Sequence, residues 1–228
     1  MAERTYGQYC GLARALDLVG ERWALLLIRD LLVSPKRFTD LRRGLPRIPS
    51  NILSTRLREL EEAGVVQRRV LARPETGVVY ELTHYGEELE EVVLRLGTWG
   101  AARLGEPRPG EVLTPDSMVI ALRAMFHPAA AAGVHVSFQF ELGPVVFHAR
   151  VDDGVLADGA GPMPEPDLVI SGGPGVRAMF TGEVDAADSV ATGLVRLSGP
   201  APDPLALLQT FTEMFRLEVP VDVPVAVA

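Results

Sequence analysis

Apolar side chains recur at helical spacing along two neighbouring segments in the first half of the chain. The first segment, 38–45, ends ahead of a proline, and the second starts at Ser50, a residue type that favours the N-cap of a helix. In the second segment Leu53, Leu57 and Leu60 fall on one side at about 100° per residue, which predicts a buried stripe. The pattern therefore predicts two short helices joined by a tight turn.

The other side of the second predicted helix is polar. It carries Asn51, Ser54, Thr55 and Arg58, whose side chains can hydrogen-bond to base edges or phosphates. An exposed helix of this kind fits the major groove of DNA, which is about 12 Å wide. An ordinary amphipathic surface helix has the same pattern, so both interpretations stay open on the helix alone.

The segments that follow favour the DNA interpretation. The β-branched segment 65–71 contains Arg68 and Arg69, a turn-forming stretch occupies 73–77, and a second β-branched segment covers 78–82. Two such segments around a turn predict a hairpin. Two helices followed by a basic hairpin have the order of a winged helix, in which the second helix enters the major groove and the hairpin straddles the DNA backbone.

Further helices are expected on both sides of this motif. Two precede it, over 11–19 and 21–32, and Thr83 is expected to cap a helix that runs to about Leu104. That last helix has more apolar residues than a winged helix needs, namely Leu89, Val92, Val93, Leu96 and Trp99. The expected partner is a second copy, because a two-fold dimer places its reading helices about 34–36 Å apart on a palindromic operator. Packing onto a second domain is the alternative.

The charge is distributed unevenly between the two halves. The net charge is −8 over 228 residues, yet 1–105 contains 16 basic and 14 acidic side chains, whereas 106–228 contains 6 and 16. Segment 36–73 holds 10 basic and 4 acidic side chains, and screening over about 8 Å makes this local patch the relevant one for phosphates. We predict DNA contacts from Arg37, Arg42, Arg43, Ser50, Asn51, Ser54, Thr55, Arg58, Arg68, Arg69 and Arg73.

Beyond Val134 the pattern changes to an alternation of period two, which predicts an antiparallel hairpin over 134–142 and 145–151 with one apolar face. Strands over 167–171 and 194–198 and helices over 115–126, 176–180 and 204–217 complete an α+β domain with an antiparallel sheet. Its phenylalanines and methionines form either a core or the wall of a cavity for a small hydrophobic ligand. The candidates for ligand contact are Met125, Phe138, Phe140, Phe147, Met179, Phe180, Phe211, Met214 and Phe215.

A stretch rich in proline and glycine, 105–110, separates the halves. We therefore predict a DNA-binding and dimerisation domain over 1–105, a linker over 106–113, a ligand-binding domain over 114–220 and a tail over 221–228. Neither a signal peptide nor a membrane-spanning run is evident, and one cysteine fits a reducing compartment, so a cytoplasmic location without membrane contact is expected.

Catalytic and metal-binding patterns are weak. The four histidines, His84, His127, His135 and His148, are scattered and have no acidic or thiol partner at ligand spacing. The glycine-rich segment 172–175 lacks the Lys and Ser/Thr of a phosphate loop and is expected to be a turn. The protein is therefore expected to be no enzyme, with neither a metal nor a cofactor.

The first half resembles the HxlR-type (MarR-like) winged-helix regulators of bacteria. The resemblance covers about 8–101 and is carried, in order, by Cys10, Gly20–Trp23, Arg37–Leu41, Leu53–Glu61, Gly64–Val66, Arg73–Pro74, Val79–Thr83, Gly86 and Trp99–Gly100. It implies a dimeric, sequence-specific transcriptional regulator whose dimer contacts come from the first helix and the helix after the wing. Some members sense oxidants or electrophiles through a cysteine where this chain has Cys10, although Gly11 replaces the usual proline. A buried, inert thiol is the alternative.

The second half resembles the sterol-carrier-protein type of lipid-binding fold. The matching segments are Phe138–Phe140, Asp152–Gly154, Pro166–Ile170, Ala178–Gly182, Gly193–Gly199 and Leu205–Phe215. The resemblance implies a hydrophobic tunnel between the sheet and its helices. Together the halves predict a regulator that binds operator DNA as a homodimer and responds to a small hydrophobic ligand. The alternatives are redox or electrophile sensing through Cys10, and a lipid carrier whose winged helix makes protein contacts only.

Overall fold

The structure is a computed structural model that describes residues 5–105, 107–173 and 176–217. It contains two compact units, the first ending at Val93 and the second beginning at Leu94, and each unit is described by itself. Glu106 of the predicted linker, 174–175 of the predicted turn, 218–220 of the predicted second domain and the predicted tail 221–228 lie outside the described residues.

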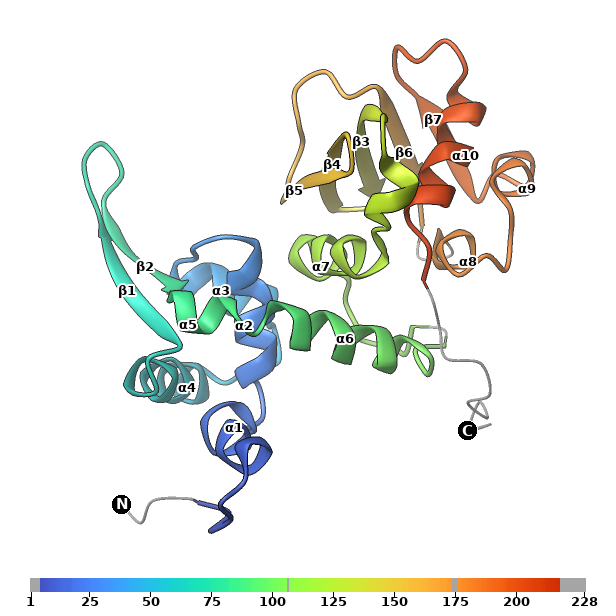
Figure 1. Cartoon of the computed structure of the whole chain (residues 1–228). Coiled ribbons are helices and arrows are strands. Elements are labelled where there is room, and N and C mark those ends of the chain that lie inside the picture. Colours follow the sequence, from blue (N-terminus) through green and yellow to red (C-terminus); the bar gives the residue numbers. More distant parts are fainter. Residues whose placement is uncertain (1–4, 106, 174–175, 218–228) are drawn as a thin grey trace. The chain divides into compact units, whose positions relative to one another are not determined.

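The first unit is a helical body from which a two-stranded hairpin projects (Figure 1). Its elements, in chain order, are α1 (Gly11–Val19), α2 (Ala24–Val33), α3 (Phe38–Gly44), α4 (Ser50–Glu62), β1 (Val66–Leu71), β2 (Gly77–Leu82) and α5 (His84–Glu87). The hairpin is antiparallel, with Arg68 opposite Tyr80. The order of two helices and a hairpin is the predicted one. Helix α2 starts later than predicted because Trp23 precedes it with a left-handed φ of 81°, which a helix cannot continue.

The predicted apolar stripe of α4 forms the centre of this unit. Leu53, Leu57 and Leu60 are at most 1% exposed and share the core with Leu27 and Leu41 of α2 and α3. Each buried leucine contributes about 1.5–3 kcal/mol relative to an exposed one. The stripe fixes which side of α4 is buried and leaves its polar side in solvent.

The single long helix predicted after the hairpin is wrong, because the chain forms α5 and a separate helix α6 (Glu90–Ala101). Thr83 does cap α5: its Oγ1 accepts a hydrogen bond from the Gly86 amide at 3.1 Å and donates to the Gly64 carbonyl at 2.6 Å. A Cβ on Gly86 would lie 2.2 Å from the carbonyl oxygen of Val65, so the close packing of α5 on the start of the wing, the hairpin of β1 and β2, requires glycine. The break between α5 and α6 follows this short, tightly packed turn.

The apolar residues of α6 are buried unevenly. Val93 is buried, whereas Val92, Leu96 and Trp99 are between 46% and 67% exposed. On α1, Leu12 is 70% exposed. Both helices therefore carry apolar surface that the described chain leaves open to solvent.

The second unit is built on a five-stranded sheet of order β5-β4-β3-β6-β7. Its elements are α7 (Pro115–Met125), the 3₁₀ helix η1 (Pro128–Ala131), β3 (His135–Leu142), β4 (Val145–Asp152), β5 (Val155–Ala160), β6 (Leu168–Gly172), α8 (Arg177–Phe180), α9 (Ala186–Ala191), β7 (Val195–Ser198) and α10 (Pro204–Met214). The prediction of an antiparallel sheet is wrong, because β6 runs parallel to β3. β5 is an unpredicted strand that runs in the same direction as β3, and the connection after it crosses the sheet, so that β6 starts again at the end where β3 starts.

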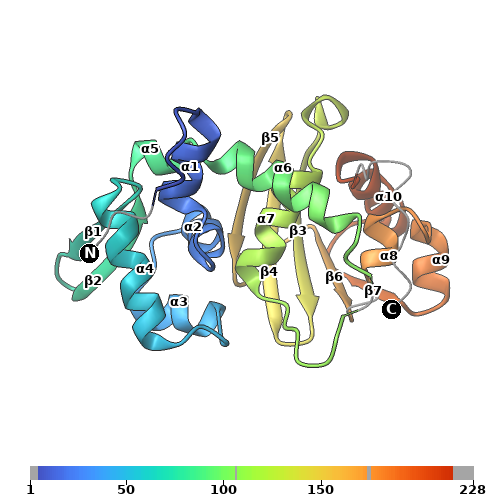
Figure 2. The same ribbon diagram turned by 90° about the horizontal axis from the view of Figure 1, so that it is seen from below.

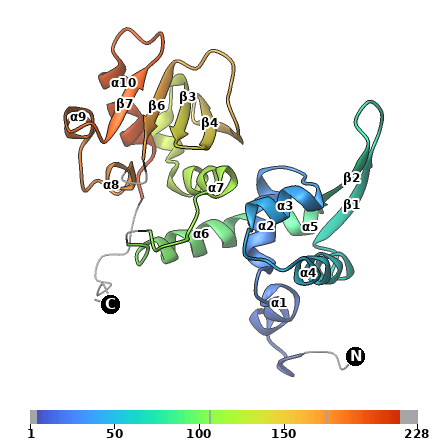
Figure 3. The same ribbon diagram turned by 180° about the vertical axis from the view of Figure 1, so that it is seen from behind.

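Helices cover one face of this sheet. Phe138 of β3 is in register with Ala149 of β4, and Ala149 with Asp158 of β5, so the three side chains point to the same side. Arg123 of α7 donates from Nε and Nη2 to the Asp158 carboxylate at 2.8–3.1 Å, and the ring of Phe211 on α10 lies 5.0 Å from that of Phe138. Helices α7 and α10 therefore pack on the same face. Figures 2 and 3 show the elements of this unit from two further directions.

The connection between β5 and β6, 161–167, crosses the opposite face. Its Met163 amide donates to Oε1 of Gln139 at 3.0 Å, and its Asp167 carboxylate accepts from the hydroxyl of Ser137 at 2.6 Å. Both polar side chains of β3 are buried, and these bonds satisfy groups that would otherwise destabilise the fold. The crossing returns the chain to the end of the sheet at which β3 starts, which makes the parallel pair possible.

Among the residues that the structure describes, no helix combines the length and the hydropathy required to cross a bilayer.

Candidate DNA-binding surface

Helix α4 supplies the centre of the predicted surface. Pro49 occupies its N-cap position and Ser50 is its first helical residue, so the predicted capping role of Ser50 is wrong. Pro49 has an extended φ and ψ of −64° and 141°, which ends the preceding turn and directs the chain into α4. Helix α4 is also held by Arg56, whose Nη2 donates to Glu21 at 2.9 Å and whose Nη1 is bonded to Glu59.

The polar side of α4 faces solvent as predicted. Asn51, Ser54 and Arg58 are exposed and Thr55 is partly exposed. Ser54 donates its hydroxyl to the carbonyl of Ser50 at 3.0 Å, so its oxygen remains able to accept a further bond. Nε of Arg58 lies 4.0 Å from Glu62, a loose contact between two exposed side chains that costs little to break.

The cations of the α3 region are on the surface too. Arg37, Arg42, Arg43 and Arg47 are all exposed. Asp40 organises the start of α3, because its carboxylate accepts from the Arg37 amide at 3.1 Å and lies 3.4 Å from Nη1 of Arg43.

The wing contributes three of the predicted arginines, which differ in their contacts. Arg68 donates from Nε and Nη2 to both carboxylate oxygens of Glu61 at 2.5 and 2.7 Å, and Glu61 raises the pKa of the Arg68 guanidinium through these bonds and its charge. Arg69 donates from Nε to Glu81 at 2.6 Å. Arg73 is exposed in the tip of the hairpin.

The positive patch is smaller than the sequence count suggests. Lys36 is buried and donates to the hydroxyl of Ser34 at 3.0 Å, and the side chain of Arg56 is only 12% exposed. Glu61 was not among the predicted site residues, yet it occupies the end of α4 against the wing. No periodicity or motif links it to Arg68, because the two belong to different elements.

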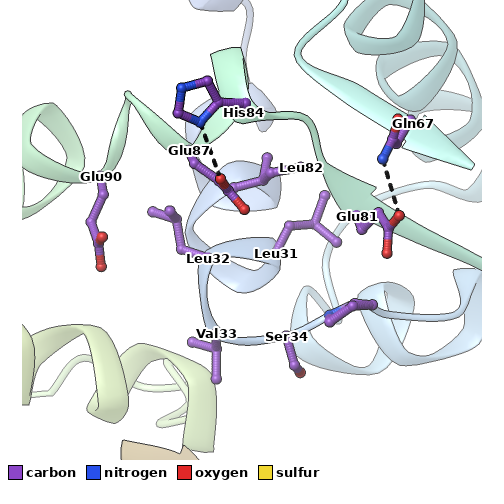
Figure 4. Close-up of a pocket in the computed structure, with 11 residues that line it drawn as sticks. Leu31, Leu32, Val33, Ser34, Gln67, Glu81, Leu82, His84, Glu87 and Glu90 are labelled. Carbon is purple, nitrogen blue, oxygen red and sulfur yellow. Dashed lines mark hydrogen bonds and ion pairs between the residues drawn. The ribbon is translucent and has the colours of Figure 1, made fainter. Parts of the chain in front are cut away.

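Two of the pockets formed by the described residues belong to the first unit. The larger of the two, of about 640 Å³, is drawn in Figure 4, and its lining combines apolar residues such as Leu31 and Leu82 with the carboxylates of Glu81, Glu87 and Glu90. These carboxylates repel phosphates, so this pocket does not fit the predicted DNA-binding surface. The smaller, of about 400 Å³, is lined by Pro35, Arg37, Asp40, Arg69, Leu71, Glu75 and Val79, between the start of α3 and the wing. It brings two of the predicted cations together.

The nine predicted ligand contacts are gathered inside the second unit, and all of them are buried. Phe211 is at their centre, with its ring 4.6–5.7 Å from the rings of Phe138, Phe140, Phe180 and Phe215. Phe140 also stacks on Phe147 at 4.7 Å. Neither of the two pockets above is lined by any of the nine.

Cys10 is the N-cap residue of α1 and is exposed, so the alternative of a buried thiol is wrong. The backbone N–H groups of Ala13 and Leu12 face the thiol and lower its pKa, because they stabilise the thiolate. The cation nearest in sequence, Arg14, lies 3.7 Å from Asp17 instead.

Three of the four histidines make structural contacts within the second unit. Nε2 of His127 is 3.0 Å from the Arg216 carbonyl, Nδ1 of His148 is 2.9 Å from the Gly161 carbonyl, and His135 is bonded to Asp152. Across the described parts of the chain, His, Cys, Asp and Glu form no group of three that could hold a metal ion.

Two helices joined by a tight turn, a projecting hairpin and an exposed polar helix face among arginines define a winged helix-turn-helix protein. Residues 18–107 match the HxlR-like helix-turn-helix family. The HTH-type transcriptional regulator YdeP of Bacillus subtilis is 37% identical over 91 residues, which are 40% of this chain and 71% of YdeP. The chain therefore belongs to the HxlR-like helix-turn-helix family of transcriptional regulators.

Other relatives match stretches of similar length. YodB of Bacillus subtilis is 38% identical over 85 residues, 37% of this chain and 76% of YodB, and Rv3095 of Mycobacterium tuberculosis is 39% identical over 109 residues, 48% of this chain and 66% of Rv3095. The solved structure of the oxidised redox regulator HypR is 36% identical and covers 41% of this chain and 96% of HypR, with a TM-score of 0.39. Quinone-bound YodB covers 40% of this chain and 94% of its own, with 33% identity and a TM-score of 0.35.

Proposed function

We propose that the protein regulates transcription in the cytoplasm by binding operator DNA as a homodimer, with α4 in the major groove and the wing along the backbone. The observation that carries this proposal is the exposed polar side of α4, flanked by the arginines of α3 and the wing. In this proposal, Asn51, Ser54, Thr55 and Arg58 contact base edges, whereas the exposed arginines of α3 and the wing tip contact phosphates.

The test is a titration of the protein with DNA from upstream of its own gene at several salt concentrations. Specific binding that weakens steeply with salt is expected, because phosphate contacts release counterions. Arg58→Ala should weaken binding by about 1–3 kcal/mol if Arg58 contacts a base, or reduce the salt slope by about one if it contacts a phosphate. Arg150→Ala is the matched control, since Arg150 is an exposed arginine on β4 of the second unit. Salt-independent binding, or equal effects of the two substitutions, would contradict the proposal.

The proposed dimer uses the apolar surface of α1 and α6. Leu12, Leu96 and Trp99 are exposed there, and side chains of this size are seldom left in water along two helices without a partner. A second copy can cover each of these surfaces, because a two-fold axis brings the same patch together from each subunit.

We further propose that the second unit is a sterol-carrier-like domain that binds a small hydrophobic ligand and thereby changes DNA affinity. This is supported by a sheet with helices on one face and by phenylalanine and methionine side chains gathered between them. A tenfold change in DNA affinity requires about 1.4 kcal/mol of differential ligand binding. Mass spectrometry of molecules extracted from the purified protein should detect an apolar ligand, and its addition should shift the operator titration.

Redox or electrophile sensing through Cys10 is a second candidate, because the thiol is exposed and its pKa is lowered. A lipid carrier whose winged helix serves protein contacts is the third candidate, and it predicts no salt-dependent DNA binding. The same titration therefore separates it from a regulator.

A further inference from the structure

The base of the wing is held from two sides. On one side, the backbone of Tyr80 in β2 pairs with that of Lys36, with N–H to carbonyl distances of 2.8 and 2.9 Å. On the other side, Arg68, which lies opposite Tyr80 in the hairpin, donates to both carboxylate oxygens of Glu61 on α4. This one pair of opposing residues in the hairpin thus contacts both the segment before α3, through Tyr80, and the end of α4, through Arg68.

The contact between Arg68 and Glu61 is better formed than a usual surface ion pair. Two N–H groups of the guanidinium fork engage two oxygens, a geometry that adds direction to charge attraction. The Glu61 side chain is only 19% exposed, and the Arg68 guanidinium also lies 5.7 Å from the Tyr80 ring centroid. Arg58 and Glu62, by contrast, are both exposed and approach only to 4.0 Å.

We propose that Glu61 and Arg68 are positioning residues whose ion pair sets the angle between α4 and the wing, so that Arg68 acts through Glu61 and not by binding phosphate. The proposal rests on the proposed DNA-binding function. An isolated two-stranded hairpin is only marginally stable, so its direction must come from contacts at its base. A wing held at the required angle before binding loses less conformational entropy on DNA than a wing that must be ordered there.

Glu61→Gln separates this role from a purely electrostatic one by the sign of its effect. Removing a negative charge near DNA should strengthen binding if only charge matters, whereas removing the partner of Arg68 should weaken it. Glu62→Gln is the matched control, because it removes the same charge from the adjacent residue, whose cation contact is loose. Arg68→Lys adds a second comparison, because lysine keeps the charge but loses the two-pronged geometry.

In the operator titration, Glu61→Gln and Arg68→Lys should each reduce affinity by about two- to fivefold, with an unchanged salt slope. The double variant should lose no more than either single one, and Glu62→Gln should lose nothing. Exchanging the charges, with Glu61→Arg and Arg68→Glu together, should recover part of the affinity. Equal effects of Glu61→Gln and Glu62→Gln, or a salt slope lowered by about one in Arg68→Ala, would overturn the proposal.

A measurement without DNA tests the geometry separately from the proposed function. Spin labels on cysteines introduced at Glu62 and Glu75, in a Cys10→Ser background, report the distance between the end of α4 and the tip of the wing. Glu61→Gln should broaden this distance distribution, while thermal unfolding confirms that the variant remains folded. An unchanged distribution overturns the positioning role whatever the DNA result. If Glu61→Gln broadens the distribution but the wild-type protein binds no DNA, the positioning role of the ion pair is supported and the proposed function is rejected.

Discussion

Glycine at position 86 illustrates how one residue determines a local arrangement in this protein. A Cβ at this position would lie 2.2 Å from the carbonyl oxygen of Val65, next to the start of the wing, so the absence of a side chain allows α5 to pack there. The neighbouring cap from Thr83 binds the amide of the same glycine. The start of the wing and the start of α5 therefore pack against each other at Gly86.

Gly86→Ala should therefore destabilise the first unit by about 1–3 kcal/mol, the usual effect of overpacking. The measurement is denaturant unfolding followed by circular dichroism. Gly97→Ala is the control, because a Cβ at this position of α6 meets nothing within 4 Å and alanine favours a helix by about 1 kcal/mol over glycine. The two substitutions should thus have opposite signs, and a neutral Gly86→Ala would contradict the contact.

Cys10 has a consequence that can be measured as a function of pH. Backbone N–H groups at the start of α1 lower the pKa of its thiol, so the thiolate forms at lower pH in the folded protein than in the unfolded chain. The rate of alkylation by iodoacetamide should accordingly reach half its maximum at a lower pH in the folded protein than in urea. Coincident profiles would contradict this and would weaken the redox candidate. Cys10→Ser should abolish any response of DNA binding to oxidants if that candidate is correct.

At the scale of elements, the sheet of the second unit depends on α10 for the cover of its apolar face. Phe211 connects the helix to β3 and to α8 through ring contacts with Phe138, Phe140 and Phe180. Helix α10 is capped by Asp203, which accepts from the Ala206 amide at 3.0 Å, and this cap defines where the helix begins relative to the sheet.

Phe211→Ala should destabilise the second unit by about 3–5 kcal/mol, the usual cost of removing a buried ring. Hydrogen exchange read by mass spectrometry should show the lost protection in β3 and β6 and no change in α4, because α4 belongs to the other unit. Thr210→Ala on the same helix is the control, since Thr210 is only partly buried and, among its described contacts, its hydroxyl bonds within α10, to the carbonyl of Ala206. Equal loss in both units would show that they do not unfold separately.

At the scale of the whole molecule, the two halves differ in charge and in the surfaces they present. The first carries the arginines of the proposed DNA surface, and residues 106–228 contain 16 acidic against 6 basic side chains. An acidic half repels phosphates, which agrees with a proposed DNA-binding surface on the winged helix.

The proposed dimer yields a prediction at this scale. Leu12→Glu or Trp99→Glu should convert the protein from dimer to monomer in sedimentation velocity, because a charge in an apolar interface is buried without a partner. Operator affinity should fall with the loss of the second reading helix. Val155→Glu, at an exposed apolar position on edge strand β5, is the control and should leave the mass unchanged. A wild-type protein that sediments as a monomer would reject the dimer.

The sequence by itself determined the local elements of the winged helix. Leu53, Leu57 and Leu60 at helical spacing fix the buried side of α4, and the same spacing exposes Asn51 and Arg58. Period-two segments around a turn give the hairpin, since these signals come from residues close together in the chain.

Only the tertiary structure decided the rest, because it depends on residues that are distant in sequence. The parallel pairing of β3 with β6 follows from the crossing of 161–167 over the sheet. The strand before this crossing, β5, has alanine, glycine and aspartate residues that give a weak strand signal. Lys36 and Arg56 are largely buried and therefore do not belong to the positive surface patch. Glu61 and Arg68 come into contact only when the chain folds. Which arginines face solvent and which hold the wing in place is therefore set by packing between elements, and sequence spacing does not encode it.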